Sequence, residues 1–168
     1  MSALPPDDPT RLPVVADPDD PNLLHLSVVG DTYTILVSGR DTANRYALID
    51  MTIPPGGGPP PHRHSFEELF HVLEGELEVT VRGTAHTAAA GHSVNVPGNA
   101  PHSFRNTGQT PARVLTFVTP AGLEEFFAEF GDPVAHRTAP APELTDAERS
   151  ARMSTAKRRA AHYGMEIL

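Results

Sequence analysis

Residues 56–75 read GGGPPPHRHSFEELFHVLEG, and this stretch decides the fold. His62 and His64 are two residues apart, so on an extended strand their side chains point to the same face. Glu68 has the same parity and joins that face if the chain stays extended. The glycines and prolines in front of His62 exclude a helix or a central strand, and they predict a stiff turn that leads the two histidines into a sheet.

A second stretch, residues 91–106, reads GHSVNVPGNAPHSFRN. Val94 and Val96 alternate with polar residues, as expected for a half-buried strand. The Pro-Gly-Asn sequence that follows is typical of a turn, after which His102 and Phe104 share one face of a further strand. We therefore predict that this segment brings a third histidine to the interior of the sheet.

These side chains form a candidate metal site on a chain without cysteine. Imidazole and carboxylate ligands suit a divalent transition metal, and Fe, Mn, Ni, Co, Cu and Zn all remain open. The predicted ligands are His62, His64, Glu68 and His102. With four protein ligands, an octahedral ion keeps two positions for water, dioxygen or substrate. The predicted lining of the substrate pocket is Phe70, Val72 and Phe104, which share faces with the ligands.

Glu68 is also the predicted general base, because it is the one anionic ligand and has apolar neighbours on its own face. The other six histidines have no comparable spacing and are expected to be ordinary structural or surface residues: His25, His71, His86, His92, His136 and His162. His71 has the opposite parity to Glu68, so we expect it to face away from the site.

Across the chain, short strand patterns separated by turns predict an all-β jelly roll with a single barrel. Strands are expected at 23–29, 33–37, 46–53 and 113–119, and hairpin turns at 74–76 and 82–83. Residues 123–130 and a segment from Thr145 to Tyr163 predict short C-terminal helices. On the first helix, Leu123, Phe127 and Phe130 share a face that is expected to pack on the barrel as ordinary core. The expected domain organisation is a disordered or draped arm at 1–21, a barrel with its first packing helix at 22–131, and a linker and helix at 132–168.

Both motif stretches resemble those of the cupin superfamily. The first has the family's spacing at Gly56, His62, His64, Glu68 and Gly75, and the second at Gly91, Pro97, His102 and Asn106. Asn99 replaces a glycine of the family pattern, and asparagine tolerates a left-handed backbone better than most residues. The resemblance implies a double-stranded β-helix barrel over roughly residues 44–119.

The flanks resemble small, single-domain cupins similar to quercetin 2,3-dioxygenase. This resemblance implies an oxygenase that acts on a small oxygen-bearing aromatic or enol substrate, with the motif glutamate as both ligand and base. Two alternatives stay open: a metal-dependent isomerase or decarboxylase, and a non-enzymatic cupin that binds a small ligand. The family also implies a homodimer, with the strands between Leu23 and Val37 as candidates for pairing across the interface.

Composition narrows the partners. The formal charge of -8 argues against nucleic acid, because phosphate binding needs a basic face. Residues 1–53 indicate coil and strands, which disfavours a helical DNA-binding domain there. No apolar run approaches the ~20 residues that span a bilayer. The absence of cysteine and of a signal-peptide pattern is compatible with a cytoplasmic protein. The only lysine, Lys157, is expected on a helix, which excludes a lysine Schiff base inside the barrel.

Overall fold

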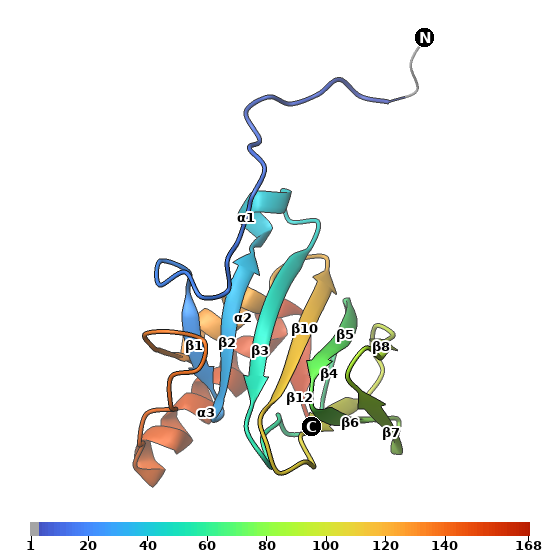
Figure 1. Ribbon diagram of the computed structural model, residues 1–168. Helices are drawn as coiled ribbons and strands as arrows, with labels where there is room; N and C mark the ends of the chain where they lie inside the picture. Colours follow the sequence, from blue (N-terminus) through green and yellow to red (C-terminus); the bar gives the residue numbers. More distant parts are fainter. Residues whose placement is uncertain (1–3) are drawn as a thin grey trace.

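The computed structural model describes residues 4–168 as two antiparallel sheets that face each other, with helices behind the larger sheet in the view of Figure 1. The seven-stranded sheet has the order β11-β1-β2-β3-β10-β5-β8, and the five-stranded sheet has the order β12-β4-β9-β6-β7. This is the all-β jelly roll that the strand and turn pattern predicts.

The strands of the larger sheet are β1 (His25–Val28), β2 (Asp31–Val37), β3 (Ala47–Ile53), β5 (Glu67–Glu74), β8 (Ser93–Val96), β10 (Ala112–Thr119) and β11 (Asp132–Pro133). Those of the smaller sheet are β4 (His62–His64), β6 (Glu76–Val81), β7 (Thr84–Ala89), β9 (His102–Arg105) and β12 (Met165–Ile167). The helices are α1 (Gly39–Thr42), α2 (Leu123–Phe130) and α3 (Asp146–Ala160), followed by the short 3₁₀ helix η1 (Ala161–Tyr163).

Alternation of apolar and polar residues along the strands builds the core between the sheets. In β10, Val114 and Val118 are completely buried, while Leu115 and Phe117 between them are only partly buried. Phe70 on β5 is also completely buried, and its ring meets Phe104 of the opposite sheet at a centroid distance of 5.2 Å. Burial of one such side chain stabilises the fold by roughly 1.5–3 kcal/mol.

Of the two predicted hairpin turns, the one at 82–83 is present and the one at 74–76 is not. The turn at Arg82 and Gly83 joins β6 and β7 as a hairpin, with φ values of 50° and 80° that match the left-handed turns of tight hairpins. The expected hairpin at 74–76 is wrong, because β5 and β6 belong to different sheets. Gly75, with φ 76°, instead lets the chain pass from one sheet to the other.

Both predicted C-terminal helices are present. Helix α2 spans Leu123–Phe130, and the Thr145–Glu148 capping box begins α3: the Glu148 amide donates to Thr145 Oγ1 at 3.3 Å, and the Thr145 amide donates to Glu148 Oε2 at 2.8 Å. The face of α2 differs from the expectation, since Phe126 is buried and Phe127 only partly so. Helix α1 was not anticipated.

The largest departure from the sequence expectation is β12. Residues 132–168 were expected to form a linker and a helix, yet they also contribute β11 and β12 to the two sheets. Strand β12 pairs with β4, so the C-terminal residues lie beside the strand that carries His62 and His64. Because this pairing joins residues about a hundred positions apart, no local pattern indicates it.

Residues 4–24 form neither helix nor strand. The division into arm, barrel and C-terminal stretch stays a prediction, and residues 1–3 of the arm lie outside the described part. The expected role of β1 and β2 in pairing across a dimer is not supported by the topology. Strand β2 has neighbours on both sides, and β11 pairs with β1 at Leu26 and Ser27.

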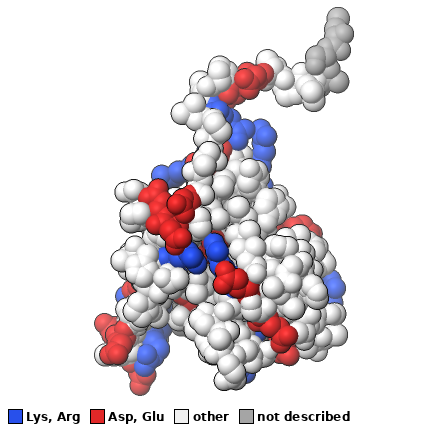
Figure 2. Space-filling model, in the orientation of Figure 1, with Lys and Arg blue, Asp and Glu red and all other residues white. Residues whose placement is uncertain are grey.

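Among residues 4–168 no helix is both long and apolar enough to cross a membrane. On the face drawn in Figure 2, lysine and arginine side chains are interleaved with acidic ones and form no continuous basic area. The absence of a nucleic-acid partner stays a prediction.

Candidate metal centre

The candidate ligands come from both sheets. His62 and His64 lie on β4 and His102 on β9, all in the five-stranded sheet, whereas Glu68 lies on β5 of the seven-stranded sheet. Glu68 was expected to join the face of His62 and His64 on one extended strand, and this part of the prediction is wrong. The chain bends at 65–66 and crosses to the other sheet, so Glu68 faces the histidines across the barrel interior.

The four side chains nevertheless meet. One ligand atom from each lies within 4.8 Å of the other three. Glu68 Oε2 is 3.0 Å from His64 Nε2 and 3.1 Å from His102 Nε2. All four residues are buried, with exposed fractions of 8% or less. The geometry thus forms a compact group of three imidazoles and one carboxylate that could hold a metal ion.

The backbone fixes the orientation of each histidine ring. His62 Nδ1 lies 3.0 Å from the Pro60 carbonyl, His64 Nδ1 2.9 Å from that of Phe66, and His102 Nδ1 2.8 Å from that of Ala100. A carbonyl accepts only, so each Nδ1 carries the proton. In a neutral imidazole, Nε2 then holds a lone pair and is free to bind a metal.

This arrangement leaves two acceptors face to face. A neutral His64 or His102 presents its Nε2 lone pair to the Glu68 carboxylate, which also only accepts. The contact is favourable only with a positive charge between the two atoms, either a proton on the ring or a metal cation. The donor set therefore fits a metal by its hydrogen bonding as well as by its spacing.

Burial and the same contacts determine the pKa values of the side chains in this cluster. Burial raises the pKa of Glu68, but the contacts with His102 and His64, which are hydrogen bonds when those rings also carry a proton on Nε2, outweigh it and bring the pKa to about 2. Burial lowers the pKa of His62 to about 4, with His102 nearby as a second cause. Burial also lowers the pKa of His102, but the hydrogen bond and charge of Glu68 exceed that effect and raise it. At neutral pH, Glu68 is ionised and His62 is neutral, as metal ligation requires.

The glycine-rich approach to β4 is held against the end of β9. The Gly56 amide donates to the Asn106 carbonyl at 2.8 Å, and the Asn106 amide donates to the Gly57 carbonyl at 3.0 Å. Gly58 has φ 136°, and a Cβ there would lie 2.0 Å from the Phe104 carbonyl oxygen. Only glycine fits this close approach, which keeps His62 opposite His102. Asn106 thus connects these two segments through its backbone and is not one of the candidate ligands.

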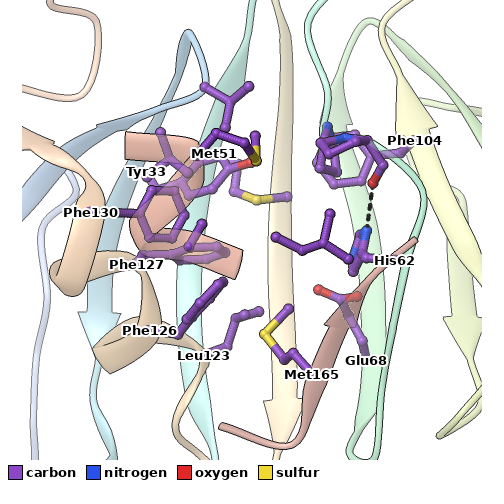
Figure 3. Close-up of a pocket in the computed structure, with 17 residues that line it drawn as sticks. Tyr33, Met51, His62, Glu68, Phe104, Leu123, Phe126, Phe127, Phe130 and Met165 are labelled. Atoms are coloured by element: carbon purple, nitrogen blue, oxygen red, sulfur yellow. Dashed lines mark hydrogen bonds between the residues drawn. The ribbon is translucent and has the colours of Figure 1, made fainter. Parts of the chain in front are cut away.

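An apolar cavity adjoins the histidines. Figure 3 shows His62, Glu68 and Phe104 on one side, and Tyr33 with the aromatic residues of α2 on the other. The α2 side chains in the wall are Leu123, Phe126, Phe127 and Phe130, and the C-terminal residues there are Met153, Ala156, Met165 and Ile167. Neither group of lining residues was predicted from the sequence. The aromatic residues of α2 were expected only to pack in the core, and no strand was expected where β12 lies.

Of the predicted pocket residues, Phe104 lines this cavity. Phe70 and Val72 are completely buried on β5 and are not part of its wall, and their role as pocket residues stays a prediction. His71 is only partly buried and lies 2.8 Å from Ser93 Oγ, away from the histidine cluster. Its expected orientation is confirmed.

A buried carboxyl group lies behind the cavity wall. Asp31 on β2 is fully buried and accepts a hydrogen bond from the Tyr33 hydroxyl at 3.1 Å, while its Oδ1 has no hydrogen-bond partner among the described residues. Burial raises the pKa of Asp31 to about 7, against the lowering effect of Tyr33 and the Gly58 amide. Nothing in the sequence pattern singles out this residue.

Comparisons with known proteins agree with the fold. Residues 49–118 match the cupin domain family Cupin_2, which spans β3 to β10 and all four candidate ligands. Residues 49–118 therefore form a cupin domain. A predicted oxalate decarboxylase from Thermotoga maritima has a similar structure, with a TM-score of 0.56, 23% identity, and coverage of 63% of this chain and 98% of that one. At this identity the likeness shows the fold alone.

Two curated relatives have different activities. Quercetin 2,3-dioxygenase of Bacillus subtilis is 27% identical over 108 residues, which cover 64% of this chain and 32% of the dioxygenase. The HTH-type transcriptional regulator PuuR of Escherichia coli is 31% identical over 116 residues, which cover 68% of this chain and 61% of the regulator. The chain thus spans about a third of one relative and three fifths of the other.

Proposed function

We propose that this protein is a metal-dependent cupin oxygenase that acts on a small oxygen-bearing aromatic or enol substrate. In this proposal His62, His64, Glu68 and His102 hold one divalent transition metal. The observation that carries it is the pairing of acceptors: two imidazole Nε2 atoms face one carboxylate oxygen while each Nδ1 donates to a carbonyl. A bound cation makes this arrangement favourable without protonation of either ring.

In this proposal, residues of the chain itself accept a proton, exclude water and bind the substrate. When bound, such a metal supplies a Lewis acid with open positions for substrate oxygen atoms or dioxygen. Glu68, ionised at neutral pH, can accept a proton from a substrate hydroxyl at the Oε atom that is not engaged. The apolar wall from α2 excludes water and binds the body of the substrate.

Similarity to quercetin 2,3-dioxygenase supports the oxygenase assignment. The same donor set also serves an isomerase or a decarboxylase that does not use dioxygen, and this remains the alternative within enzymes. A fold shared by so many activities does not decide between them.

The second candidate function is a cupin that binds a small ligand without turning it over. Two observations favour it: the cavity is small, and the regulator relative is 31% identical to this chain. This candidate keeps the metal cluster or the cavity as a binding site but assigns no proton transfer to Glu68.

Elemental analysis of protein purified without an affinity tag, followed by oxygen-electrode measurements with flavonols and related enols, tests the proposal. We expect about one transition metal per chain and metal-dependent oxygen uptake with at least one enol. Stoichiometric metal without oxygen uptake would favour the binding function or the oxygen-independent enzymes. Absence of metal after reconstitution with each candidate ion would refute the metal site itself.

A further inference from the structure

The cavity beside the histidine cluster is smaller than the substrates that its chemistry suits. Its volume is about 60 Å³, whereas sites for small organic molecules usually measure ~300–1,000 Å³. A single water needs at least ~10–15 Å³ in a comparable measure, so the cavity has room for only a few waters. An aromatic substrate therefore enters only if one wall moves.

One wall comes from the end of the chain. We call residues 146–168, which form α3, η1 and β12, the C-terminal strap. It contributes Met153, Ala156, Met165 and Ile167 to the lining. In the register of β12 and β4, Met165 lies opposite His64 and Ile167 opposite His62. The strap thus places two apolar side chains directly beside two of the candidate ligands.

The strand of the strap is held at one edge only. β12 is the outermost strand of its sheet and pairs with β4 over three residues. Two flanking hydrogen bonds extend this pairing, from the Ser65 amide to the Gly164 carbonyl and from the Leu168 amide to the Pro61 carbonyl, both at 2.9 Å. If β12 leaves, β4 still pairs with β9, so the sheet that carries the histidines remains connected.

The helix of the strap is also lightly attached. Its fully buried residues are the small Ala156 and Ala160, and its ion pairs, Arg152 with Asp132 and Arg159 with Glu129, are partly exposed. Partly exposed ion pairs contribute little to stability. Helix α2 instead buries Leu123, Phe126 and Phe130. The small buried side chains of α3 and the edge position of β12 are features of an element that opens below the global unfolding free energy.

We propose that the C-terminal strap is a cover that opens to admit ligand to the cluster, and that Met165 and Ile167 determine the size of the molecule that fits. This inference rests on the proposed function for its substrate class. The admitted molecule is uncharged and mostly apolar with an oxygen-bearing end, because among residues 4–168 only Tyr33, His62 and Glu68 bring polar side-chain atoms other than sulfur to the cavity wall.

A reducible disulfide between β4 and β12 tests whether the C-terminal strap has to open. Arg63 and Glu166 are opposite each other in the register, form an exposed ion pair, and belong to a chain without cysteine. Opposed residues of antiparallel strands have Cα atoms about 4.5–5.5 Å apart, within the range that a disulfide bridges. In the oxidised Arg63→Cys/Glu166→Cys variant, β12 is therefore fixed to β4, and dithiothreitol releases it.

The measurement is binding of N-phenyl-1-naphthylamine, an uncharged apolar dye that fluoresces when it leaves water. We expect the oxidised variant to bind it at least about tenfold more weakly than the reduced one, since apparent affinity falls with the fraction of open molecules. A disulfide in the β6–β7 hairpin, Glu78→Cys/Thr87→Cys, joins another opposed pair whose residues do not line the cavity, and it should change nothing.

Met165→Ala provides a second test, because a wider cavity should bind the dye several-fold more tightly. Equal binding by the oxidised and reduced variants would overturn the proposal, as would no binding by the unmodified protein or no effect of Met165→Ala. Metal content of the same samples decides the proposed function separately. Redox-dependent dye binding without metal keeps the cover and rejects the metal role, whereas metal binding with redox-independent dye binding rejects only the cover.

Discussion

His62 lies directly opposite His102 in the antiparallel pairing of β4 with β9, and their rings are 4.2 Å apart between centroids. This pairing brings the two motif stretches together, because each supplies one of the opposed residues. The Gly56–Asn106 and Asn106–Gly57 hydrogen bonds fix the same two segments from the side. The position of the third histidine therefore depends on strand pairing as much as on its own turn.

Loss of two ligands from one strand should abolish metal binding. We expect the His62→Ala/His64→Ala variant to retain only background metal, because the two remaining side chains cannot enclose an ion. His71→Ala is the matched control, since His71 faces away from the cluster, and it should keep the metal content of the unmodified protein. Elemental analysis after identical reconstitution measures the metal content of both variants. Stoichiometric metal in the double variant would exclude His62 and His64 as ligands.

The Glu68→Gln variant tests whether Glu68 acts as a general base in addition to being a metal ligand. The amide keeps an oxygen donor but cannot accept a proton as the carboxylate does. We expect the metal-loaded variant to bind substrate and turn it over roughly a hundred- to ten-thousand-fold more slowly, the usual cost of losing a general base. Single-turnover rates at matched metal occupancy provide the measurement. A full rate in the metal-loaded variant would leave Glu68 as a ligand only.

Asp31 should make stability fall as pH rises. Burial raises the folded-state pKa to about 7, above the ordinary value of 3.8 for an aspartate, so the folded protein keeps a proton that the unfolded chain has released. This contribution is complete below about pH 4 and is lost as pH rises through about 7. We expect Asp31→Asn to gain stability relative to the unmodified protein between pH 5 and pH 8.

Urea unfolding of the metal-free proteins at the two pH values measures this difference. Asp7→Asn, at an exposed position of the N-terminal segment, is the control and should show no such change. If the Asp31→Asn difference is the same at pH 5 and pH 8, Asp31 does not titrate within this window.

Gly58→Ala should damage both the fold and the metal site. The added Cβ would meet the Phe104 carbonyl at 2.0 Å, and a φ of 136° adds strain, so the β4 approach has to move away from β9. Gly83→Ala has a positive φ of 80° but no atom within 4 Å of the new Cβ, and it isolates the cost of backbone strain.

We expect Gly83→Ala to lose about 1–2 kcal/mol, and Gly58→Ala to lose more and to bind metal less tightly. Thermal unfolding and metal titration of both variants make the comparison. Equal losses in the two variants, with unchanged metal affinity, would show that the close approach at Gly58 does not position His62.

The homodimer stays a prediction. The edge strands of the two described sheets are β11, β8, β12 and β7, whereas β1 and β2 lie inside their sheet, so edge pairing through the N-terminal strands is not the expected route. Light scattering across a range of protein concentrations should give twice the mass of an 18.0 kDa chain. A monomer mass at the highest concentration would contradict the prediction.

The sequence by itself determined the features that depend on local geometry. Alternation along a strand predicts that His62 and His64 share a face, as do His102 and Phe104, and the burial of all four agrees. The capping box of Thr145 and Glu148 and the amphipathic pattern of 123–130 likewise locate two helices, because caps and periodicity act over a few residues.

Only the tertiary structure decided which segments meet. The bend at 65–66 places Glu68 on the opposite sheet, and Gly75 leads to a change of sheet where a hairpin was expected. The pairing of β12 with β4 places Met165 and Ile167 beside the histidines. Such contacts depend on long-range strand pairing and on burial of the whole apolar surface, and local spacing carries no record of either.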